Sequence, residues 1–353
     1  MAIDGDFESR PLPKTFVLEL TRRCNNYCLY CYLGEGILDH NPQPSGSGEL
    51  STEELLDVIS RLCDQAPVEN IALSGGEPLL RADLPEILAH MRSRGVKPVI
   101  ITNGTLLTKD RVAATVNGVL YEVTLLSYRE QIHDHLAGRR GAWNAVIDGM
   151  CNIRQAGGTM VASFIATKLN CPDLKETVRL AIALGAGALM YNRINLGSYN
   201  MRFAEKLLPT PEMIRENMDV LEEAGEKYGL PVALTIPIEP CVVDVRKYRN
   251  ISAGFCPLAG ENSYFTIDPV GNIRLCNHSP SVLGNIRHQK FADIYYKHPY
   301  VRRFRETWPA ECVNCADDLK QLCCGGCRAA AEQCYGTTER VDPFVILNSA
   351  RSS

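Results

Sequence analysis

Three cysteines fall within eight residues near the start of the chain, directly after the apolar run Phe16 to Leu20. They are Cys24, Cys28 and Cys31, spaced Cys-x3-Cys-x2-Cys. Three thiolates this close can hold one inorganic centre, but a zinc site or a cubane cluster normally takes four protein ligands. One coordination position therefore stays open for a substrate or cofactor. The alternatives are three unrelated packed thiols, or a zinc ion with a fourth ligand from outside.

After this loop, short apolar runs alternate with amphipathic segments as far as residue 238. Short Val, Ile and Leu-rich runs joined by helical crossovers are typical of parallel strands. We expect six strand–helix units that form a parallel α/β sheet or partial barrel. The expected strands are Thr15 to Leu20, Asn70 to Leu73, Lys97 to Thr102, Leu120 to Leu126, Met160 to Ala166 and Ala188 to Ile194, with one more over residues 231–238. The expected helices begin at Ser51 and then cover Leu84 to Ser93, Lys109 to Thr115, Trp143 to Ala156, Asp173 to Leu184 and Pro211 to Tyr228.

The composition is that of an ordinary globular protein. The chain has 353 residues, 45% hydrophobic and 22% charged, and a formal net charge of -4. Nothing in this balance favours nucleic acid or an anionic membrane as a partner. Because no leader or long apolar span is visible, we expect a cytoplasmic protein, in which fifteen cysteines indicate metal-bound thiolates rather than disulfides.

Ligands of parallel α/β folds gather where the strands end at their carboxyl edge. The candidates at those positions are Gly75, Gly76 and Glu77 after the second strand, Asn103 after the third, Ser127 after the fourth and Arg193 near the end of the sixth. Glycines permit close backbone approach, and a glutamate can accept from an ammonium group. The alternative is a tight turn followed by a carboxylate at a helix start.

The cysteine loop, with Tyr30 before its last cysteine, and the Gly75-Gly76-Glu77 segment resemble the radical S-adenosylmethionine (radical SAM) enzymes. The resemblance implies that Cys24, Cys28 and Cys31 hold a 4Fe-4S cluster whose fourth iron binds SAM. Reductive cleavage of SAM then gives a 5'-deoxyadenosyl radical that abstracts a hydrogen atom from substrate. It also implies that the SAM contacts are made by Tyr30, Gly75, Gly76, Glu77, Asn103 and Ser127. Arg193 is added as a candidate because the end of the sixth strand points at the same pocket.

A second group of cysteines lies after the α/β pattern stops. Two Cys-x2-Cys-like pairs in a small domain are a natural zinc site, so zinc is the alternative here. The whole pattern resembles the SPASM extension of radical SAM enzymes, which holds two auxiliary 4Fe-4S clusters. It consists of Cys256, Gly271-x4-Cys276, Cys312-x2-Cys315, a Cys-x3-Cys ending in Gly-Gly-Cys327, and a final Cys334. The implied ligands are Cys256, Cys276 and Cys327 for the first auxiliary cluster, and Cys312, Cys315, Cys323 and Cys334 for the second.

Two cysteines have open roles. Cys241 is either the fourth ligand of the first auxiliary cluster or a free thiol near the pocket, and Cys324 competes with Cys323 as a ligand. Epimerases of this superfamily quench a substrate radical with a cysteine thiol. Cys241 and Cys324 are therefore the candidate hydrogen donors.

We expect four parts: a lead-in over 1–14, a radical SAM partial barrel over 15–238, a SPASM domain over 239–336 and a C-terminal tail over 337–353. Three hypotheses for the function remain open. The first is oxidation, cross-linking or epimerisation of a peptide, which a separate carrier protein would present because only a short segment precedes the first strand. The second is a dehydrogenase or epimerase of a sugar or aminocyclitol. The third is an iron-sulfur or zinc binding module without SAM chemistry. Flavodoxin or ferredoxin is the expected electron donor.

Overall fold

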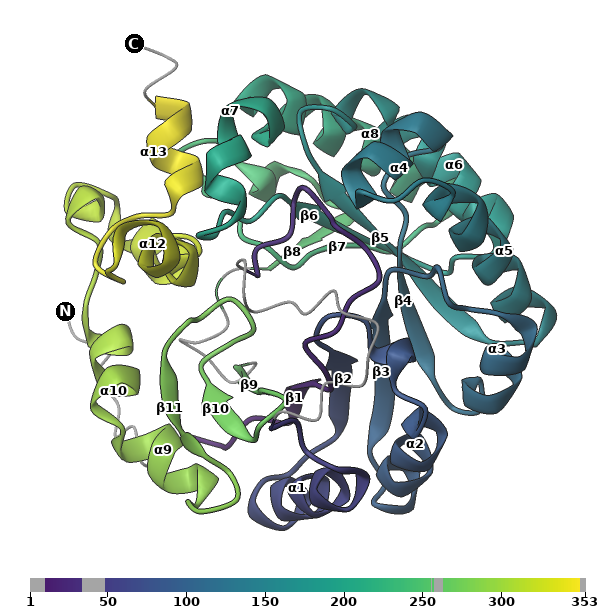
Figure 1. Ribbon diagram of the computed structural model, residues 1–353. Coiled ribbons are helices and arrows are strands. Elements are labelled where there is room, and N and C mark those ends of the chain that lie inside the picture. The colour runs from purple at the N-terminus through teal and green to yellow at the C-terminus, as the bar shows by residue number, and fades with distance from the viewer. Residues whose placement is uncertain (1–9, 34–47, 255, 257–262, 350–353) are drawn as a thin grey trace.

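The computed structural model describes residues 10–33, 48–254, 256 and 263–349. Its centre is one sheet of eleven strands in the order β11-β10-β9-β1-β2-β3-β4-β5-β6-β7-β8, which curves so that helices surround it (Figure 1). The strands from β1 to β8 pair in parallel, and β9 joins the same sheet parallel to β1. The expected parallel α/β sheet is confirmed.

The strands are β1 (Thr15–Glu19), β2 (Asn70–Ser74), β3 (Lys97–Thr102), β4 (Leu120–Thr124), β5 (Thr159–Ala166), β6 (Leu189–Arg193), β7 (Val232–Leu234), β8 (Ile251–Ala253), β9 (Tyr264–Ile267), β10 (Asn272–Arg274) and β11 (Val282–Asn285). The helices around the strands are α1 (Thr52–Gln65), α2 (Leu84–Ser93), α3 (Lys109–Thr115), α4 (Glu130–Ala137), α5 (Ala142–Gln155), α6 (Leu174–Leu184), α7 (Ala204–Leu207) and α8 (Pro211–Tyr228). The C-terminal helices are α9 (Phe291–Lys297), α10 (Pro299–Glu306), α11 (Asp317–Cys323), α12 (Arg328–Tyr335) and α13 (Pro343–Ser349).

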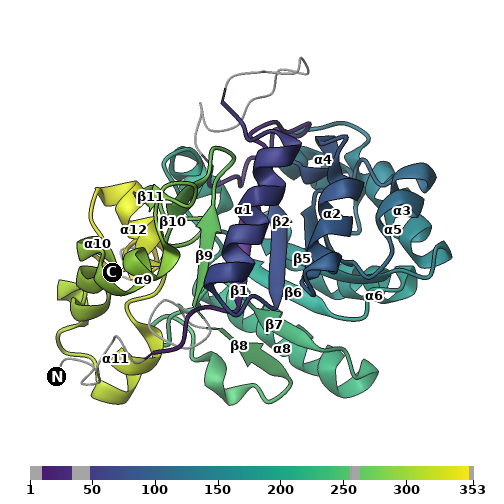
Figure 2. The same cartoon turned by 90° about the horizontal axis from the view of Figure 1, so that it is seen from below.

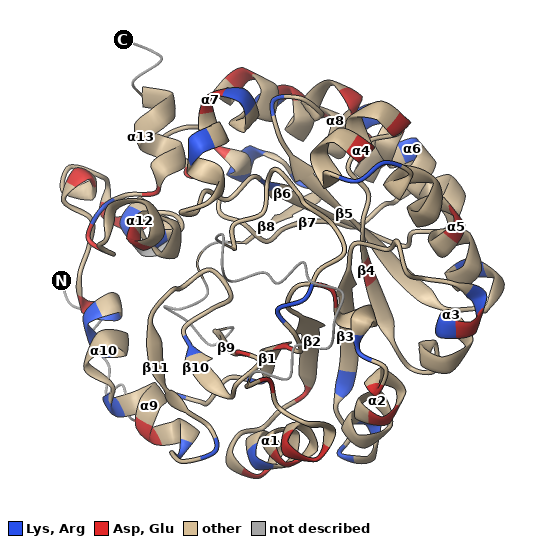
Figure 3. Cartoon of the chain, viewed as in Figure 1, with Lys and Arg blue, Asp and Glu red and all other residues tan. Residues whose placement is uncertain are grey.

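Alternation along each strand divides the residues between the helices and the interior. Phe16 and Leu18 are fully buried, whereas Val17, between them, lines the central cavity. Successive side chains of a strand point to opposite faces, so one face packs on the helices and the other encloses a space. Figure 3 shows that charged residues are concentrated on the outer helices and that the strands are largely uncharged.

The C-terminal region continues the sheet instead of standing apart. The hairpin β9–β10 places β9 beside β1, and Phe291 of α9 packs edge-on against Phe16 of β1, with ring centroids 5.0 Å apart. Phe291 also packs against Phe265 of β9, at 5.1 Å. In Figure 2 the C-terminal helices lie together beside β9 to β11, on the side opposite α3, α5 and α6. The region expected to be a tail contains α13, of which Phe344 is fully buried.

Several expected elements have different ends. Helix α4 was missed, and the strand expected to run to Leu126 ends at Thr124. The strand expected over 231–238 is only Val232–Leu234. The predicted start of α1 is confirmed: Ser51 accepts from the N–H of Glu54, and the carboxylate of Glu54 accepts from the N–H of Ser51. None of the described helices is long and apolar enough to cross a membrane.

Candidate active site

A cavity of about 400 Å³ lies inside the curve of the sheet. Cys24, Cys28 and Cys31 all line it, together with Gly75 and Gly76 at the end of β2. The cysteine loop and the glycine turn were singled out from sequence separately, and the structure brings them to one wall. This wall is at the carboxyl ends of the strands, where parallel α/β folds bind their ligands.

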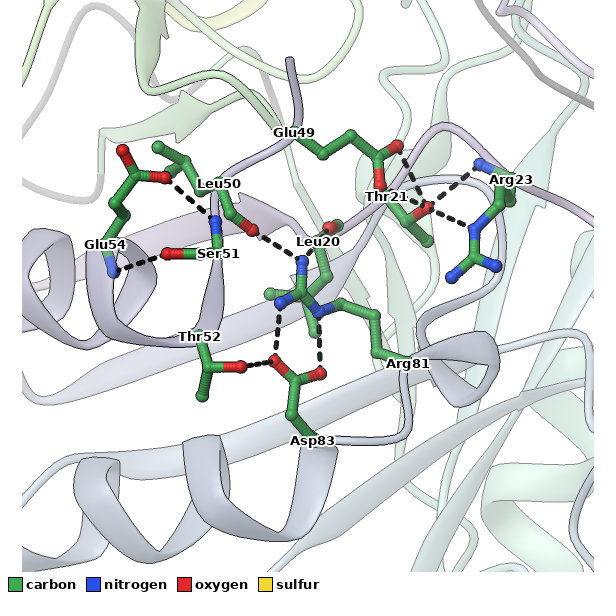
Figure 4. A network of polar contacts seen from close by, with 10 residues as sticks. All are labelled: Leu20, Thr21, Arg23, Glu49, Leu50, Ser51, Thr52, Glu54, Arg81 and Asp83. Atoms are coloured by element: carbon green, nitrogen blue, oxygen red, sulfur yellow. Dashed lines mark hydrogen bonds and ion pairs between the residues drawn. The ribbon is translucent and has the colours of Figure 1, made fainter. Parts of the chain in front are cut away.

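The start of the cysteine loop is held by a polar network (Figure 4). Arg81 donates to the carbonyl oxygens of Leu20 (3.2 Å) and Leu50 (3.0 Å) and pairs with Asp83 at 2.5 Å. The hydroxyl of Thr21 donates to Glu49 and accepts from the N–H of Arg23, the residue before Cys24. The chain between β1 and the first thiol is therefore fixed before any ligand binds.

The loop is also braced from its far side. The N–H groups of Tyr27 and Leu29 donate to Ala137 and Leu136 at the end of α4, at 3.1 and 3.0 Å. Asn103 donates from its side-chain amide to Asn25 at 2.8 Å. Helix α4, which sequence reasoning missed, thus supports the cysteine loop.

Burial is the main cause that raises the pKa of Cys24, Cys28 and Cys31 to about 12, and neighbouring thiolate charges add to it. Bound iron would remove these protons, because metals bind the thiolate form. No three His, Cys, Asp or Glu side chains of the described residues converge as ligands of a single metal ion would. Three thiols that line one cavity are the donor set that a 4Fe-4S cluster with one open iron takes.

Glycine is required at both positions of the turn after β2. Gly75 has a φ of 121°, which L side chains rarely adopt, and a Cβ there would overlap the carbonyl oxygen of Thr21. A Cβ on Gly76 would overlap the carbonyl oxygen of Arg23, next to Cys24. The absence of side chains lets the turn pack directly on the backbone of the cysteine loop.

We therefore expect Gly76→Ala to push the turn and the cysteine loop apart and to weaken SAM binding about tenfold or more, since two backbone segments must move. Gly187→Ala is the matched control, because its Cβ would meet only the Met160 carbonyl oxygen at 3.9 Å. Equilibrium binding of SAM to the anaerobically reconstituted protein measures the effect. Native affinity in Gly76→Ala would show that the close approach has no role.

Glu77 takes a different place from the one expected. It is fully buried, and its carboxylate accepts from the N–H of Leu79 (3.1 Å), the hydroxyl of Thr102 (2.8 Å) and the N–H of Asn103 (2.9 Å). Burial raises its pKa to about 7, against the lowering effect of these donors. Glu77 thus ties the end of β2 to the end of β3, and it does not line the cavity, whereas Asn103 and Tyr30 do.

Ser127 and Arg193 are also engaged by protein groups. The hydroxyl of Ser127 donates to Asp173 at 2.5 Å, and Ser127 is not part of the cavity wall. Arg193 touches the cavity, but its guanidinium pairs with Glu239 (3.0 Å) and Asp342 (2.5 Å), and all three side chains are fully buried. The structure therefore gives Arg193 an anchoring position between β6 and the C-terminal region.

The interior of the sheet carries a polar strip that sequence reasoning missed. The hydroxyl of Ser163 on β5 hydrogen-bonds the carboxylate of Glu122 on β4, and Ser163 also accepts from Asn192 on β6 at 3.5 Å. Asn192 in turn accepts from Thr235. Burial raises the pKa of Glu122, and no Lys or Arg of the described chain pairs with it. Polar residues within apolar strands were the available signal.

Cys256, Cys276 and Cys327 gather at a smaller cavity of about 30 Å³. Burial and the charge of Cys256 raise the pKa of Cys276 to about 12. This cavity shares a wall with the larger one, formed by residues that line both: Thr235, Ile236, Tyr264 and His278. The three thiols expected to hold the first auxiliary cluster therefore lie behind a wall of the larger cavity, which the cysteine loop also lines.

Three of the other expected ligands, Cys312, Cys315 and Cys323, form a separate group with Cys241. After burial, the charges of Cys315 and Cys241 raise the pKa of Cys312 to about 12, and Cys312 and Cys315 share a hydrogen bond. Cys241 also interacts electrostatically with Cys323. The structure thus places Cys241 beside the second group, whereas the sequence predicted either a ligand of the first cluster or a free thiol near the pocket. The remaining expected ligand is Cys334. Burial and the charge of Asp342 raise its pKa, and no other described thiol contributes to that shift.

If Cys241 is a ligand of the second cluster, Cys241→Ala should lower iron from about 12 to about 8 per chain, since one cubane of three is lost. Cys63→Ala is the control, because Cys63 packs against the core from α1 and should keep all the iron. Iron and sulfide analysis after reconstitution checks this. Full iron in Cys241→Ala together with loss in Cys334→Ala would return the role to Cys334.

Neither candidate hydrogen donor lines the described cavities. Cys241 is exposed, and Cys324 is buried at the end of α11 with a positive φ of 54°. Their role as donors stays a prediction.

Comparison with known proteins agrees with this geometry. Residues 18–181 match the radical SAM superfamily, and residues 256–316 match the iron-sulfur cluster-binding domain called SPASM. The chain belongs to the radical SAM superfamily and carries a C-terminal SPASM domain. SAM and 4Fe-4S clusters are the cofactors that this membership implies.

Relatives match over almost the whole chain. PqqA peptide cyclase from Bradyrhizobium diazoefficiens is 26% identical over 354 residues, covering 97% of this chain and 88% of the relative. AdoMet-dependent heme synthase from Methanosarcina barkeri is 26% identical over 366 residues, covering 96% and 98%.

Two solved structures share the fold. Streptococcus suis SuiB bound to S-adenosylmethionine has a TM-score of 0.73 at 16% identity, covering 94% of this chain and 77% of SuiB. The structure of anSMEcpe with AdoMet and the Cp18Cys peptide has a TM-score of 0.71 at 15% identity, covering 96% and 95%.

Proposed function

We propose that this radical SAM enzyme modifies a peptide oxidatively, using two auxiliary clusters. The observation that carries the proposal is the geometry of the cavity. One wall holds Cys24, Cys28 and Cys31, and another is shared with the group of Cys256 and Cys327. A substrate between these walls would meet the site of hydrogen abstraction on one side and an electron acceptor on the other.

When bound, SAM and its cluster supply the 5'-deoxyadenosyl radical that removes a hydrogen atom from the substrate. The chain's own residues bind and orient. The cysteine loop would hold the cluster through three thiolates, while Gly75 and Gly76 pack against the backbone of that loop and also line the cavity.

The polar strip forms the part of the cavity that would orient the substrate. Glu122 offers a carboxyl without an ion-pair partner among the described cations, and its raised pKa makes it a group that can accept or return a proton. Ser163, Asn192 and Thr235 add hydroxyl and amide groups. We propose that these residues hold the polar part of the substrate.

Support for a peptide comes from the relatives. A protein named for cyclising the PqqA peptide matches 97% of this chain, and the similar fold of anSMEcpe was solved with a peptide. A flavodoxin or ferredoxin would deliver the electrons, and a carrier protein could present the peptide.

A small-molecule substrate is the second candidate. The heme synthase of Methanosarcina barkeri is as similar as the peptide cyclase, and its name refers to a product that is not a peptide. A sugar or aminocyclitol that the enzyme oxidises or epimerises would be such a small-molecule substrate.

Anaerobic incubation with SAM and reductant in D₂O tests the two classes. The substrates are a peptide encoded beside the gene and, separately, an aminocyclitol. We expect the peptide to lose two hydrogen atoms by mass, in step with 5'-deoxyadenosine. Exchange of one hydrogen for deuterium would indicate epimerisation. An unchanged peptide with turnover of the aminocyclitol would favour the second candidate.

A further inference from the structure

Between the cysteine loop and the first auxiliary group lies a continuous line of contacts. Tyr32, which follows Cys31, stacks on His278 with ring centroids 3.8 Å apart. His278 Nδ1 lies 2.9 Å from the side-chain nitrogen of Asn195, and the same nitrogen lies 3.2 Å from the sulfur of Cys327. One amide thus touches both a residue of the dividing wall and an expected cluster ligand.

The orientation of this amide follows from its neighbours. An iron-bound thiolate has no proton, so the group facing Cys327 must be the donating NH₂ of Asn195. The NH₂ has two hydrogens, and the second is directed to His278 Nδ1, which must then accept. Gln333 of α12 donates to the His278 carbonyl oxygen at 2.5 Å, which holds that residue in place.

Asn195 is not a fully satisfied core residue. It is only 5% exposed, yet its side-chain oxygen has no hydrogen-bond partner among the described residues. A buried acceptor without a partner is costly, on the order of 1–3 kcal/mol. Packing alone would not favour an amide here, whereas a thiolate that needs a donor would.

We propose that Asn195 is a positioning residue that sets the reduction potential of the first auxiliary cluster through its hydrogen bond to the Cys327 thiolate, with His278 fixing its orientation. Hydrogen bonds to the sulfurs tune such potentials. Reduction adds one negative charge to the cluster, and the N–H dipole stabilises that charge. The bond therefore raises the potential and favours transfer of an electron from the substrate radical into the cluster. This inference rests on the proposed auxiliary cluster.

Redox titration of the reconstituted holoenzyme, followed by electron paramagnetic resonance, tests the proposal. In Asn195→Ala, one auxiliary signal should shift to lower potential by about a tenfold change in the reduction equilibrium, which is about 59 mV for a one-electron couple. Asn195→Asp keeps the size of the side chain but places a carboxylate beside the thiolate, so its shift should be larger. If the alanine variant loses iron, the aspartate variant still gives the result.

Asn277→Ala is the matched control. Asn277 follows Cys276 and lines the same cavity, but its amide contacts the phenols of Tyr32 and Tyr264. In Asn277→Ala, the reduction potential of the first auxiliary cluster should stay as in the native enzyme. Unshifted potentials in both Asn195 variants, or an equal shift in Asn277→Ala, would overturn the inference. Failure of the proposed function looks different: auxiliary iron would be missing from the native protein itself.

Discussion

Replacing Cys24, Cys28 and Cys31 together by alanine is expected to reduce 5'-deoxyadenosine formation from SAM to background. The reason is that these thiols are the ones that line the wall beside the Gly75–Gly76 turn, and no cluster can be held there without them. Chromatography of the anaerobic reaction with SAM and dithionite measures the product.

The same triple variant should keep its auxiliary clusters, so its iron should fall only from about 12 to about 8 per chain. Cys151→Ala is the control, because Cys151 is a partly buried thiol of α5 that packs on the core. It should change neither the formation of 5'-deoxyadenosine nor the iron content. Formation of 5'-deoxyadenosine at the native rate by the triple variant would refute the assignment of the SAM site.

Arg193→Met is expected to destabilise the protein by about 3–5 kcal/mol, because it leaves Asp342 buried without its cation and Glu239 buried without its hydrogen-bond donor. Asp342 also accepts from the N–H of Cys327 at 2.9 Å, so the first auxiliary group should loosen as well. The shift of the unfolding midpoint in denaturant measures the loss. If Arg193 instead contacts SAM directly, the role expected from sequence, Arg193→Met would weaken SAM binding and leave stability nearly unchanged.

Arg179→Met is the control for this prediction. Arg179 pairs with Glu176 on the surface, with side chains 44% and 48% exposed, and such pairs contribute about 1 kcal/mol or less.

Burial raises the pKa of Glu239 to about 8, so the folded state binds its proton more tightly than the unfolded state. Its contribution to stability therefore falls as the pH rises toward about 8. The charge of Arg193 lowers the pKa of Glu239, so Arg193→Met raises that pKa further. The destabilisation by Arg193→Met should therefore be greater at about pH 8 than at about pH 6.

The sequence predicted the α/β elements well where local signals coincide. The strand Lys97–Thr102 and the helices Leu84–Ser93 and Pro211–Tyr228 have the expected ends, because turn residues or proline bound each apolar pattern. The fourth strand was predicted too long. Leu125 and Leu126 continue its apolar run and are buried, but they lie beyond its last residue, Thr124.

That error also affected the site. The expectation for Ser127 followed from its position after the apolar run, yet the side chains of β4 that reach the cavity are Glu122 and Thr124. Alternation makes residues two apart share a face, and both are polar in an otherwise apolar strand. Reading the run as half-buried would have identified them.

Contacts between distant parts of the chain were out of reach. Asp342 meets Arg193 from 149 positions away, and Cys241 joins the group of Cys312 although Cys256 is closer in sequence. Spacing identifies which residues can be ligands, but the fold decides which of them meet. The reason for a single anchoring arginine with two carboxylates is likewise visible only in three dimensions.

Iron, sulfide and zinc content after anaerobic reconstitution of the native chain tests the central claim most directly. The account of one SAM-binding cluster and two auxiliary clusters predicts about 12 iron per chain, an equal amount of sulfide and no zinc. About 4 iron with bound zinc would contradict it, because the C-terminal cysteines would then form a structural zinc site and the proposed path for electrons out of the substrate would not exist.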